Sequence, residues 1–249
     1  MIKNNQTTIQ SIKINNKVIA DFCYKKNDNS IEPYIKGFTK QYKELIKFFN
    51  KQPLKITINF VYTRKEMNKH WGVKSRKRLC AMVDNDNVYV IYIFSPLVFE
   101  KLTIYKQTEI LPTIIHETAH TFVTEINKKS FAWMNEGICQ YLEKQNNQDN
   151  VIKKKNWEWF IENNIFFDPD IKWSKQVEYD GYKISYNLVN YILKTKGKNK
   201  FIKLLKIRRE GGLEELKQKM NKVVGDMDLL LNKFSQKLKL VNKAKMELN

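Results

Sequence analysis

With 249 residues, 42% of them hydrophobic and 12% aromatic, the chain is long enough to bury a core, which excludes disorder as the main expectation. The net charge of +19 permits an acidic partner, but scattered lysines indicate solvated faces and make nucleic acid or anionic membrane only an alternative partner. A polar N-terminus, no apolar run that spans a bilayer and three cysteines without paired spacing predict a cytoplasmic protein with free thiols.

The first part of the chain predicts a mixture of helix and strand. Apolar residues at three- and four-residue steps indicate an amphipathic helix over 32–50, and the alternating, β-branched run at 54–63 indicates a strand. Two further strand-like runs, at 78–83 and 88–94, flank the sequence Asp84-Asn85-Asp86-Asn87. That composition is typical of a hairpin or a tight loop.

After Pro96 the pattern is helical almost to the end. We predict helices near 108–127, 134–144, 179–194, 198–208, 213–222 and 226–240. Because mixed elements come first and helices follow, the order favours an α+β fold with segregated layers over an alternating βαβ fold. We expect a mixed N-terminal subdomain over residues 1–128 and an all-helical C-terminal subdomain over residues 129–249.

The sequence His116-Glu117-Thr118-Ala119-His120 is the centre of the functional argument. Imidazoles at positions i and i+4 of a helix lie on one face, where both can bind one metal ion, and Glu117 lies beside them. Neutral imidazole suits zinc, and a water at an open zinc position has a pKa of about 7. Glu117 is then the predicted base that takes the proton of this water. The alternative is a chance match, but two of the three histidines of the chain fall in this motif.

A catalytic zinc needs a third protein ligand. Ile126 and Val123 occupy the positions of the third histidine and the glycine of the longer metzincin motif, which excludes that pattern. The later run FAWMNEGICQYLE places Glu136 at the start of a second helical pattern, and Gly137 permits a close helix approach. Alone, Glu136 would be read as a solvated carboxylate at a helix start, so its assignment depends on the preceding histidines.

HETAH followed by WMNEGICQY resembles the gluzincins, in particular the aminopeptidase-like and bacterial peptidase-MA-like families of zinc metallopeptidases. The resemblance implies a zincin-like fold, with an edge strand and the active-site helix in the N-terminal subdomain and Glu136 in the C-terminal one. It implies hydrolysis of a peptide or protein substrate. Cys139 stands where these families commonly have alanine.

The same resemblance assigns two further features. Tyr182 falls on a family tyrosine that donates a hydrogen bond to the oxyanion, and Tyr186 is the alternative. The run at 87–96 resembles the edge strand to which an extended peptide adds. The GxMEN motif of true aminopeptidases is missing, and residues 80–84 are at most a faint echo of it, so aminopeptidase specificity does not follow.

Two other functions stay open at this point. One is a basic module that binds nucleic acid or membrane and carries a non-catalytic metal site. The other is a zinc hydrolase of a non-peptide amide or ester. A structural zinc is closed by four protein ligands, and only three are apparent here, none of them a cysteine. The pattern therefore favours the enzyme.

Overall fold

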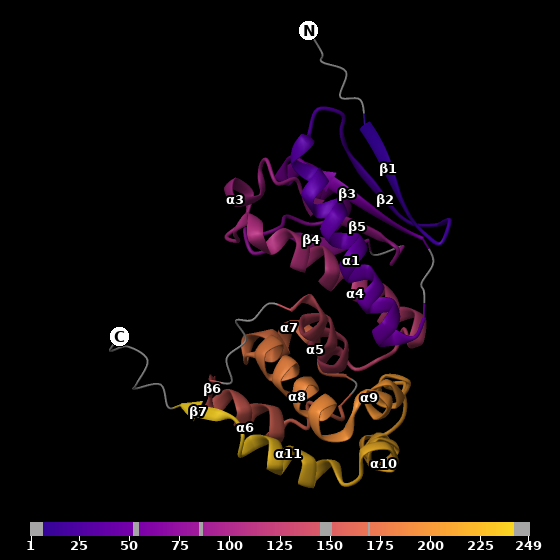
Figure 1. Cartoon of the computed structure of the whole chain (residues 1–249). Coiled ribbons are helices and arrows are strands. Elements are labelled where there is room, and N and C mark those ends of the chain that lie inside the picture. The colour runs from indigo at the N-terminus through magenta and orange to yellow at the C-terminus, as the bar shows by residue number, and fades with distance from the viewer. Residues whose placement is uncertain (1–6, 52–54, 85–86, 145–150, 169, 242–249) are drawn as a thin grey trace. The chain divides into compact units, whose positions relative to one another are not determined.

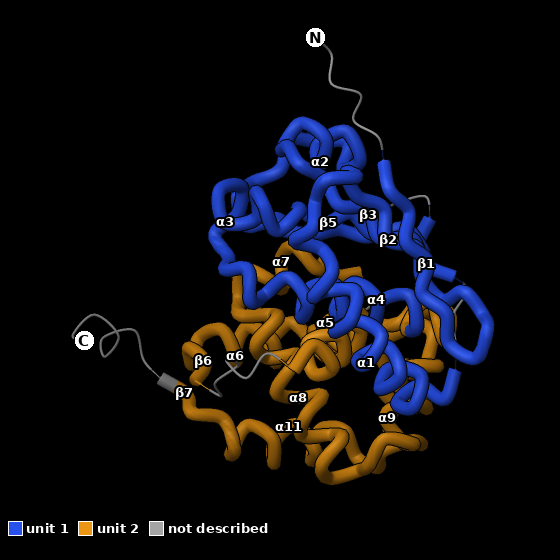
Figure 2. The backbone as a smooth tube through the Cα atoms, turned by 45° about the horizontal axis from the view of Figure 1, so that its top comes forward, with its two compact units in different colours: residues 1–122 blue, residues 123–249 orange. Residues whose placement is uncertain are grey.

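The computed structural model describes residues 7–51, 55–84, 87–144, 151–168 and 170–241 (Figure 1). The chain divides into two compact units, residues 1–122 and 123–249 (Figure 2). This division falls within helix α4 (Ile110–Ile126), earlier in the chain than the boundary at residue 128 expected from the sequence. No described helix is long and apolar enough to cross a membrane.

The N-terminal unit is built on a mixed five-stranded sheet in the order β1-β2-β3-β5-β4. Its strands are β1 (Thr7–Ile14), β2 (Lys17–Lys25), β3 (Ile56–Val61), β4 (Ala81–Val83) and β5 (Val90–Phe94). The three inner strands run parallel, whereas β1 and β4 at the two edges are antiparallel to their neighbours. A chain with this sheet and many helices agrees with the predicted α+β class.

The run at 87–96, which we expected to form the edge strand, lies inside the sheet. Its strand β5 pairs with β3 on one side and with β4 on the other. The expectation was wrong because an apolar run does not distinguish an inner strand from an edge strand. The edge strand next to β5 is β4, which falls within the faint echo at 80–84. The expected β4–β5 hairpin is confirmed by their pairing, while turn residues 85–86 lie outside the described residues.

Strands β1 and β2 form a hairpin that the sequence analysis did not predict. The turn residues Asn15 and Asn16 have φ of 48° and 61°. Two successive positive φ angles are typical of a type I′ turn, which asparagine tolerates. The Asn-Asn pair between two alternating runs was therefore an available signal.

Helix α1 (Glu32–Phe49) follows the predicted helix closely and covers one face of the sheet. Its buried residues recur at three- and four-residue steps: Ile35, Phe38, Tyr42, Leu45 and Phe49. The ring of Phe38 meets Phe22 of β2 at 5.3 Å between centroids, and Tyr42 and Phe49 both pack against Phe122 of α4. Helix α1 thus holds α4 against the core of the sheet. It also connects parallel strands β2 and β3, a βαβ crossover that the predicted segregated order did not include.

The buried carboxylate of Asp28 joins the ends of the three parallel strands. Asp28 follows β2 and is only 3% exposed. Its Oδ2 accepts hydrogen bonds from the hydroxyls of Tyr62, at 2.8 Å, and Ser95, at 2.5 Å, which directly follow β3 and β5. Its Oδ1 accepts from the amide of Ser30, at 3.1 Å. Neutral donors therefore satisfy this carboxylate in the core.

Short helices complete the N-terminal unit: η1 (Asn29–Ile31), α2 (Arg64–Trp71), α3 (Phe99–Leu102) and η2 (Gln107–Glu109). The first residue of α2, Arg64, fixes the segment that leads into β4. Its Nη1 donates to the Ser75 hydroxyl at 3.2 Å and to the carbonyl oxygens of Arg76 and Leu79 at 3.1 and 3.0 Å. Its guanidinium lies 4.5 Å from the ring centroid of Phe94 in β5.

The C-terminal unit is mainly helical. Its helices are α5 (Ala132–Glu143), α6 (Lys154–Glu162), α7 (Trp173–Glu178), α8 (Gly181–Lys196), α9 (Lys198–Leu205), α10 (Leu213–Val224) and α11 (Met227–Ser235). Two short parallel strands, β6 (Val151–Lys153) and β7 (Lys239–Val241), pair with each other. They correct the prediction of an all-helical C-terminal subdomain and of a helix that continues to residue 240. Strands of three residues that pair across such a separation leave no local period to detect.

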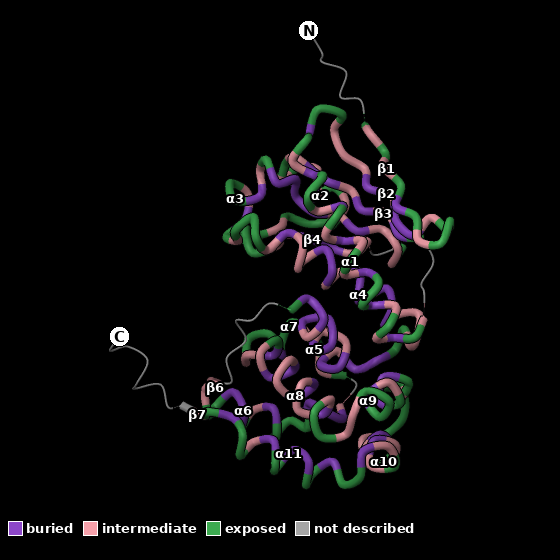
Figure 3. The backbone as a smooth tube through the Cα atoms, viewed as in Figure 1, coloured by how far each residue is buried: buried purple, intermediate pink, exposed green. Residues whose placement is uncertain are grey.

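Helices α5 and α8 approach closely at Gly137. A Cβ atom there would lie 2.5 Å from the carbonyl oxygen of Ser185 and 2.7 Å from Cγ2 of Val189. Only glycine fits this contact. The sequence analysis expected Gly137 to serve an approach to the preceding helix, whereas the contact found is with α8. Figure 3 shows the buried stretch of α5, whose Trp133 also packs edge to face on Phe166 with centroids 5.7 Å apart.

Candidate metal centre

Helix α4 buries one face and leaves a polar strip partly exposed. Its core residues Ile114, Ile115, Ala119 and Phe122 are fully buried. His116, Glu117 and His120 are only partly buried. The buried hydroxyls of Thr118 and Thr121 donate within the helix, to the carbonyl oxygens of Ile114 and Thr118 at 2.7 Å each. One face of α4 therefore anchors the helix, and the other carries these three polar side chains.

The two histidines of this strip converge on one point. Their Nε2 atoms lie 3.1 Å apart, and their ring centroids lie 4.8 Å apart. Two nitrogens bound at about 2.0–2.1 Å to one tetrahedral ion are about 3.3 Å apart. The observed spacing thus fits two ligands of a single metal ion.

Glu136 of α5 is the third member of the group. One ligand atom each of His116, His120 and Glu136 lies within 4.8 Å of the other two. Among the described residues, these three form a group of side chains that could hold a metal ion. Two imidazoles and one carboxylate suit borderline divalent metals, and three protein ligands leave a coordination position open.

Glu117 has a neighbour that the sequence analysis missed, the thiol of Cys80. Burial raises the pKa of Cys80 to about 12, and the nearby negative charge of Glu117 contributes to this shift. The side chain of Thr113, one turn before Glu117 on α4, hydrogen-bonds to the same thiol. Because Cys80 directly precedes β4, the edge strand begins beside Glu117. No local pattern announces a contact between residues so far apart in the chain.

The edge position of β4 leaves one of its sides without a strand partner in the described sheet. The order of strands places β4 outside β5, and the amide of Phe94 donates to the carbonyl oxygen of Cys80 at 3.3 Å. With the Arg64 contacts before it, β4 is fixed on its inner side. Its outer side is therefore a short strand edge near Glu117, on a strand whose position is fixed by its other contacts.

The two candidate tyrosines have different surroundings in the C-terminal unit. Tyr182, in the first turn of α8, is 39% exposed, and its ring meets Trp173 edge to face with centroids 4.9 Å apart. Tyr186 lies one turn later. Burial, together with the neighbouring Tyr141 and Glu143, raises the pKa of Tyr186. Which of the two faces a reacting oxyanion stays a prediction.

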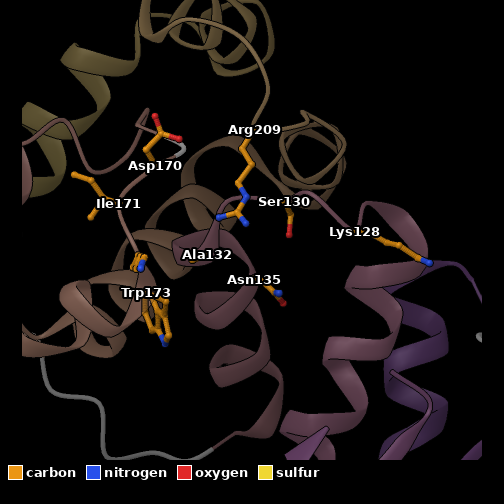
Figure 4. Close-up of a pocket in the computed structure, with 9 residues that line it drawn as sticks. Lys128, Ser130, Ala132, Asn135, Asp170, Ile171, Trp173 and Arg209 are labelled. Carbon is orange, nitrogen blue, oxygen red and sulfur yellow. The ribbon is translucent and has the colours of Figure 1, made fainter. Parts of the chain in front are cut away.

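A polar pocket of about 480 Å³ lies at the beginning of α5 (Figure 4). Its lining comes from separate segments of the C-terminal unit: Lys128, Ser130, Ala132, Asn135, Asp170, Ile171, Lys172, Trp173 and Arg209. Asn135 directly precedes Glu136, so the pocket adjoins this candidate ligand along the helix. The sequence analysis did not identify these residues, because only the fold brings the segments together.

Comparisons of the sequence with protein-family models and with curated proteins found no match. The resemblance to the gluzincins therefore rests on the motif residues of α4 and α5.

Proposed function

We propose that this chain is a zinc-dependent metallopeptidase of the gluzincin kind with a zincin-like fold. The observation that carries the proposal is the grouping of His116, His120 and Glu136 within 4.8 Å, with Glu117 between the two histidines on one helix. In this proposal the first three residues bind zinc and Glu117 acts as the general base.

The donor set supports zinc as the metal. Two histidines and a glutamate with an open position form a ligand set found in catalytic zinc sites of peptidases. When bound, zinc supplies Lewis acidity, which lowers the pKa of water to about 7 and polarises a carbonyl group. The remaining chemistry belongs to the side chains of the protein.

Glu117 is the proposed general base, because it lies between the two histidines in the sequence of the same helix. It accepts the proton from the attacking water and then returns this proton to the leaving amine. Cys80 does not compete for this role, because its raised pKa keeps the thiol protonated at neutral pH. Tyr182 donates a hydrogen bond to the developing oxyanion, with Tyr186 as the alternative donor.

The edge of β4 supports a peptide as the substrate. An extended peptide can pair with the outer side of this strand through backbone hydrogen bonds, which hold the chain without regard to most of its side chains. Because β4 starts beside Glu117, a peptide bound there passes close to the base.

Metal analysis and peptide digestion test the proposal together. The purified protein should contain about one zinc per chain, and it should cleave members of a peptide library until a chelator is added. Glu136→Ala should lower zinc affinity by more than the roughly 10- to 100-fold typical of losing an outer-shell partner. Glu125→Ala, on α4 but outside the ligand group, is the matched control and should keep its zinc.

Two results would contradict the proposal in different ways. Protein that is free of metal after growth in zinc-replete medium would exclude the metal centre. Protein that holds zinc and cleaves only non-peptide amides or esters would keep the metal centre and replace the peptidase by another hydrolase.

A further inference from the structure

The pocket at the beginning of α5 points to a class of substrate. We propose that this pocket binds a carboxylate of the peptide, either the side chain of an aspartate or glutamate or the C-terminal carboxylate. The inference rests on the proposed peptidase function, because it assigns the pocket to a residue near the cleaved bond.

Arg209 supplies the cation of this site. Its backbone amide donates to the carbonyl oxygen of Lys129 at 2.9 Å, which holds it next to the loop before α5. The nearby carboxylate of Glu210 is already engaged by Arg208, at 2.9 Å, and by Lys129. Within the described chain, no ion pair or hydrogen bond occupies the guanidinium of Arg209. A planar guanidinium in this state is suited to a bidentate contact with a carboxylate.

The charges around Arg209 favour an anion in the pocket. The lining includes three cationic residues, Lys128, Lys172 and Arg209, and one acidic residue, Asp170. In Figure 4 the Arg209 side chain extends towards Ala132, whereas the Asp170 carboxylate and the Lys128 amine point away from it. Arg209 is therefore the cation directed at the α5 end of the pocket.

Ser130 is a second, independent donor. It is only 8% exposed and lines the pocket, and its hydroxyl has no hydrogen-bond partner among the residues that the structure describes. This hydroxyl can donate to a ligand oxygen. Among the described residues, the lining also contains a buried donor without a hydrogen-bond partner, Nε1 of Trp173. A buried donor without a partner is costly, and a ligand oxygen would satisfy it. Helix α5 begins two residues after Ser130, and its N-cap Phe131 gives no side-chain oxygen to the first turn. The positive end of this helix adds to the attraction for an anion.

The walls and the size of the pocket fit a peptide side chain. Ile171 and the ring of Trp173 supply apolar surface, and the volume of about 480 Å³ lies within the range of small-ligand sites. Ala132 and Glu136 are separated by four residues of helix, or about 6 Å at 1.5 Å per residue. An extended peptide advances about 3.3–3.6 Å per residue. The carboxylate therefore belongs within about two residues of the cleaved bond.

Matched peptides test this assignment on the zinc-loaded protein. Each pair of peptides differs by one Glu-to-Gln exchange at a single position within three residues of the cleaved bond, and each peptide is made with a free and with an amidated C-terminus. We expect kcat/KM to be about tenfold higher for the peptide with the carboxylate, either at one Glu/Gln position or at the free C-terminus. A factor of about ten is the contribution of a partly exposed hydrogen bond to a charged group. The position that responds tells a side-chain carboxylate from a terminal one.

Variants of the two neighbouring arginines provide the control. Arg209→Ala should bring the ratio of kcat/KM for the Glu and Gln peptides close to one. Arg209→Glu should instead favour a peptide with lysine at the position that responds. Arg208→Ala removes an arginine that pairs with Glu210 outside the pocket, and it should keep the wild-type ratio. Thermal melting of each variant shows whether it is folded.

Binding of the same peptides to zinc-loaded Glu117→Gln protein separates the two proposals. Hydrolysis without preference for any carboxylate, or a preference that survives Arg209→Ala, would overturn the pocket assignment and leave the peptidase intact. Tighter binding of the Glu peptide, lost in the Glu117→Gln/Arg209→Ala protein, would support the pocket even if wild type cleaved nothing. Equal binding of both peptides without hydrolysis would overturn both proposals.

Discussion

In the proposed metal centre, the carboxylate of Glu117 is the group that distinguishes catalysis from metal binding alone. It lies between the two histidines on the partly exposed strip of α4, and its negative charge helps to raise the pKa of Cys80. Glu117→Gln preserves shape and hydrogen bonding but removes the base. We expect zinc content and melting temperature close to wild type and turnover lower by about 10²–10⁴-fold.

The matched control for this substitution is Glu125→Gln, on the same helix and outside the ligand group. It should keep normal turnover in the same peptide assay. Wild-type turnover in Glu117→Gln would show that this residue is not the base.

The roles of the two tyrosines of α8 can be separated by single phenylalanine variants. If Tyr182 stabilises the oxyanion, Tyr182→Phe should lower kcat more than it raises KM, because the hydrogen bond forms in the transition state. Tyr186→Phe should then leave kcat near wild type. Steady-state kinetics on one cleaved peptide measure both, and the reverse pattern would assign the role to Tyr186.

The thiol of Cys80 should be slow to react. Its pKa of about 12, compared with 9.0 for an ordinary thiol, lowers the thiolate fraction near pH 8 by about 1,000-fold. Alkylation by iodoacetamide, followed by peptide mass spectrometry, should therefore label Cys80 poorly in folded protein and faster as the pH rises. In urea-unfolded protein the same cysteine should react at an ordinary rate. Equal rates in both states would contradict the buried position of the thiol.

At the scale of elements, the contact between α5 and α8 depends on the missing side chain of Gly137. In Gly137→Ala the new methyl would press on the backbone oxygen of Ser185, which can move only with its helix. We expect the free energy of unfolding to fall by an amount near the upper end of the about 1–3 kcal/mol typical of overpacking. This loss exceeds the gain of about 1 kcal/mol that alanine brings in helix propensity.

Gly37→Ala is the matched control for this substitution, because Gly37 also lies within a helix, α1. The three atoms nearest to a Cβ there all belong to the flexible end of the Leu111 side chain. Its melting temperature should stay near wild type or rise. Equal losses in the two variants would mean that the close approach of α5 and α8 does not limit stability.

The elements that the sequence predicted are those whose pattern is local. Helix α1 could be found from the spacing of residues such as Phe38 and Tyr42, and α4 and α5 from similar patterns. The grouping of His116 and His120 follows from helix geometry alone, since residues four apart share a face. Glu136 needed the second helix to return to the same point, which a spacing cannot ensure.

The features that could not be predicted depend on contacts between distant segments. Cys80 meets Glu117 because β4 runs beside α4, and β6 pairs with β7 through three residues each. Ser130 and Arg209 share a pocket because the backbone of Arg209 bonds to Lys129. The wrong prediction of β5 as the edge strand, a position that β4 occupies, has the same origin. Strand order is a property of the assembled sheet and leaves no local pattern.

At the scale of the whole molecule, the net charge of +19 comes from basic residues scattered along the whole sequence. Ion pairs such as Lys36–Glu32, Lys154–Glu158 and Lys219–Glu215 lie along three different helices at an exposed spacing of four residues. We therefore expect weak binding to duplex DNA and to anionic vesicles, which falls steeply between about 50 and 200 mM salt. Fluorescence anisotropy and vesicle sedimentation measure this, and tight binding that resists salt would favour the basic module.

The network at Asp28 also determines which alignments of the sheet are tolerated. Its partners Tyr62 and Ser95 lie 34 and 67 positions away, each just past the end of a parallel strand. If β3 or β5 paired in a shifted register, these hydroxyls would move away from Asp28. The buried carboxylate would then lack its donors. An unpaired buried charge costs several kcal/mol. The Asp28 side chain thus destabilises misaligned registers of the three parallel strands. It does so from the end of the sheet where β2, β3 and β5 finish.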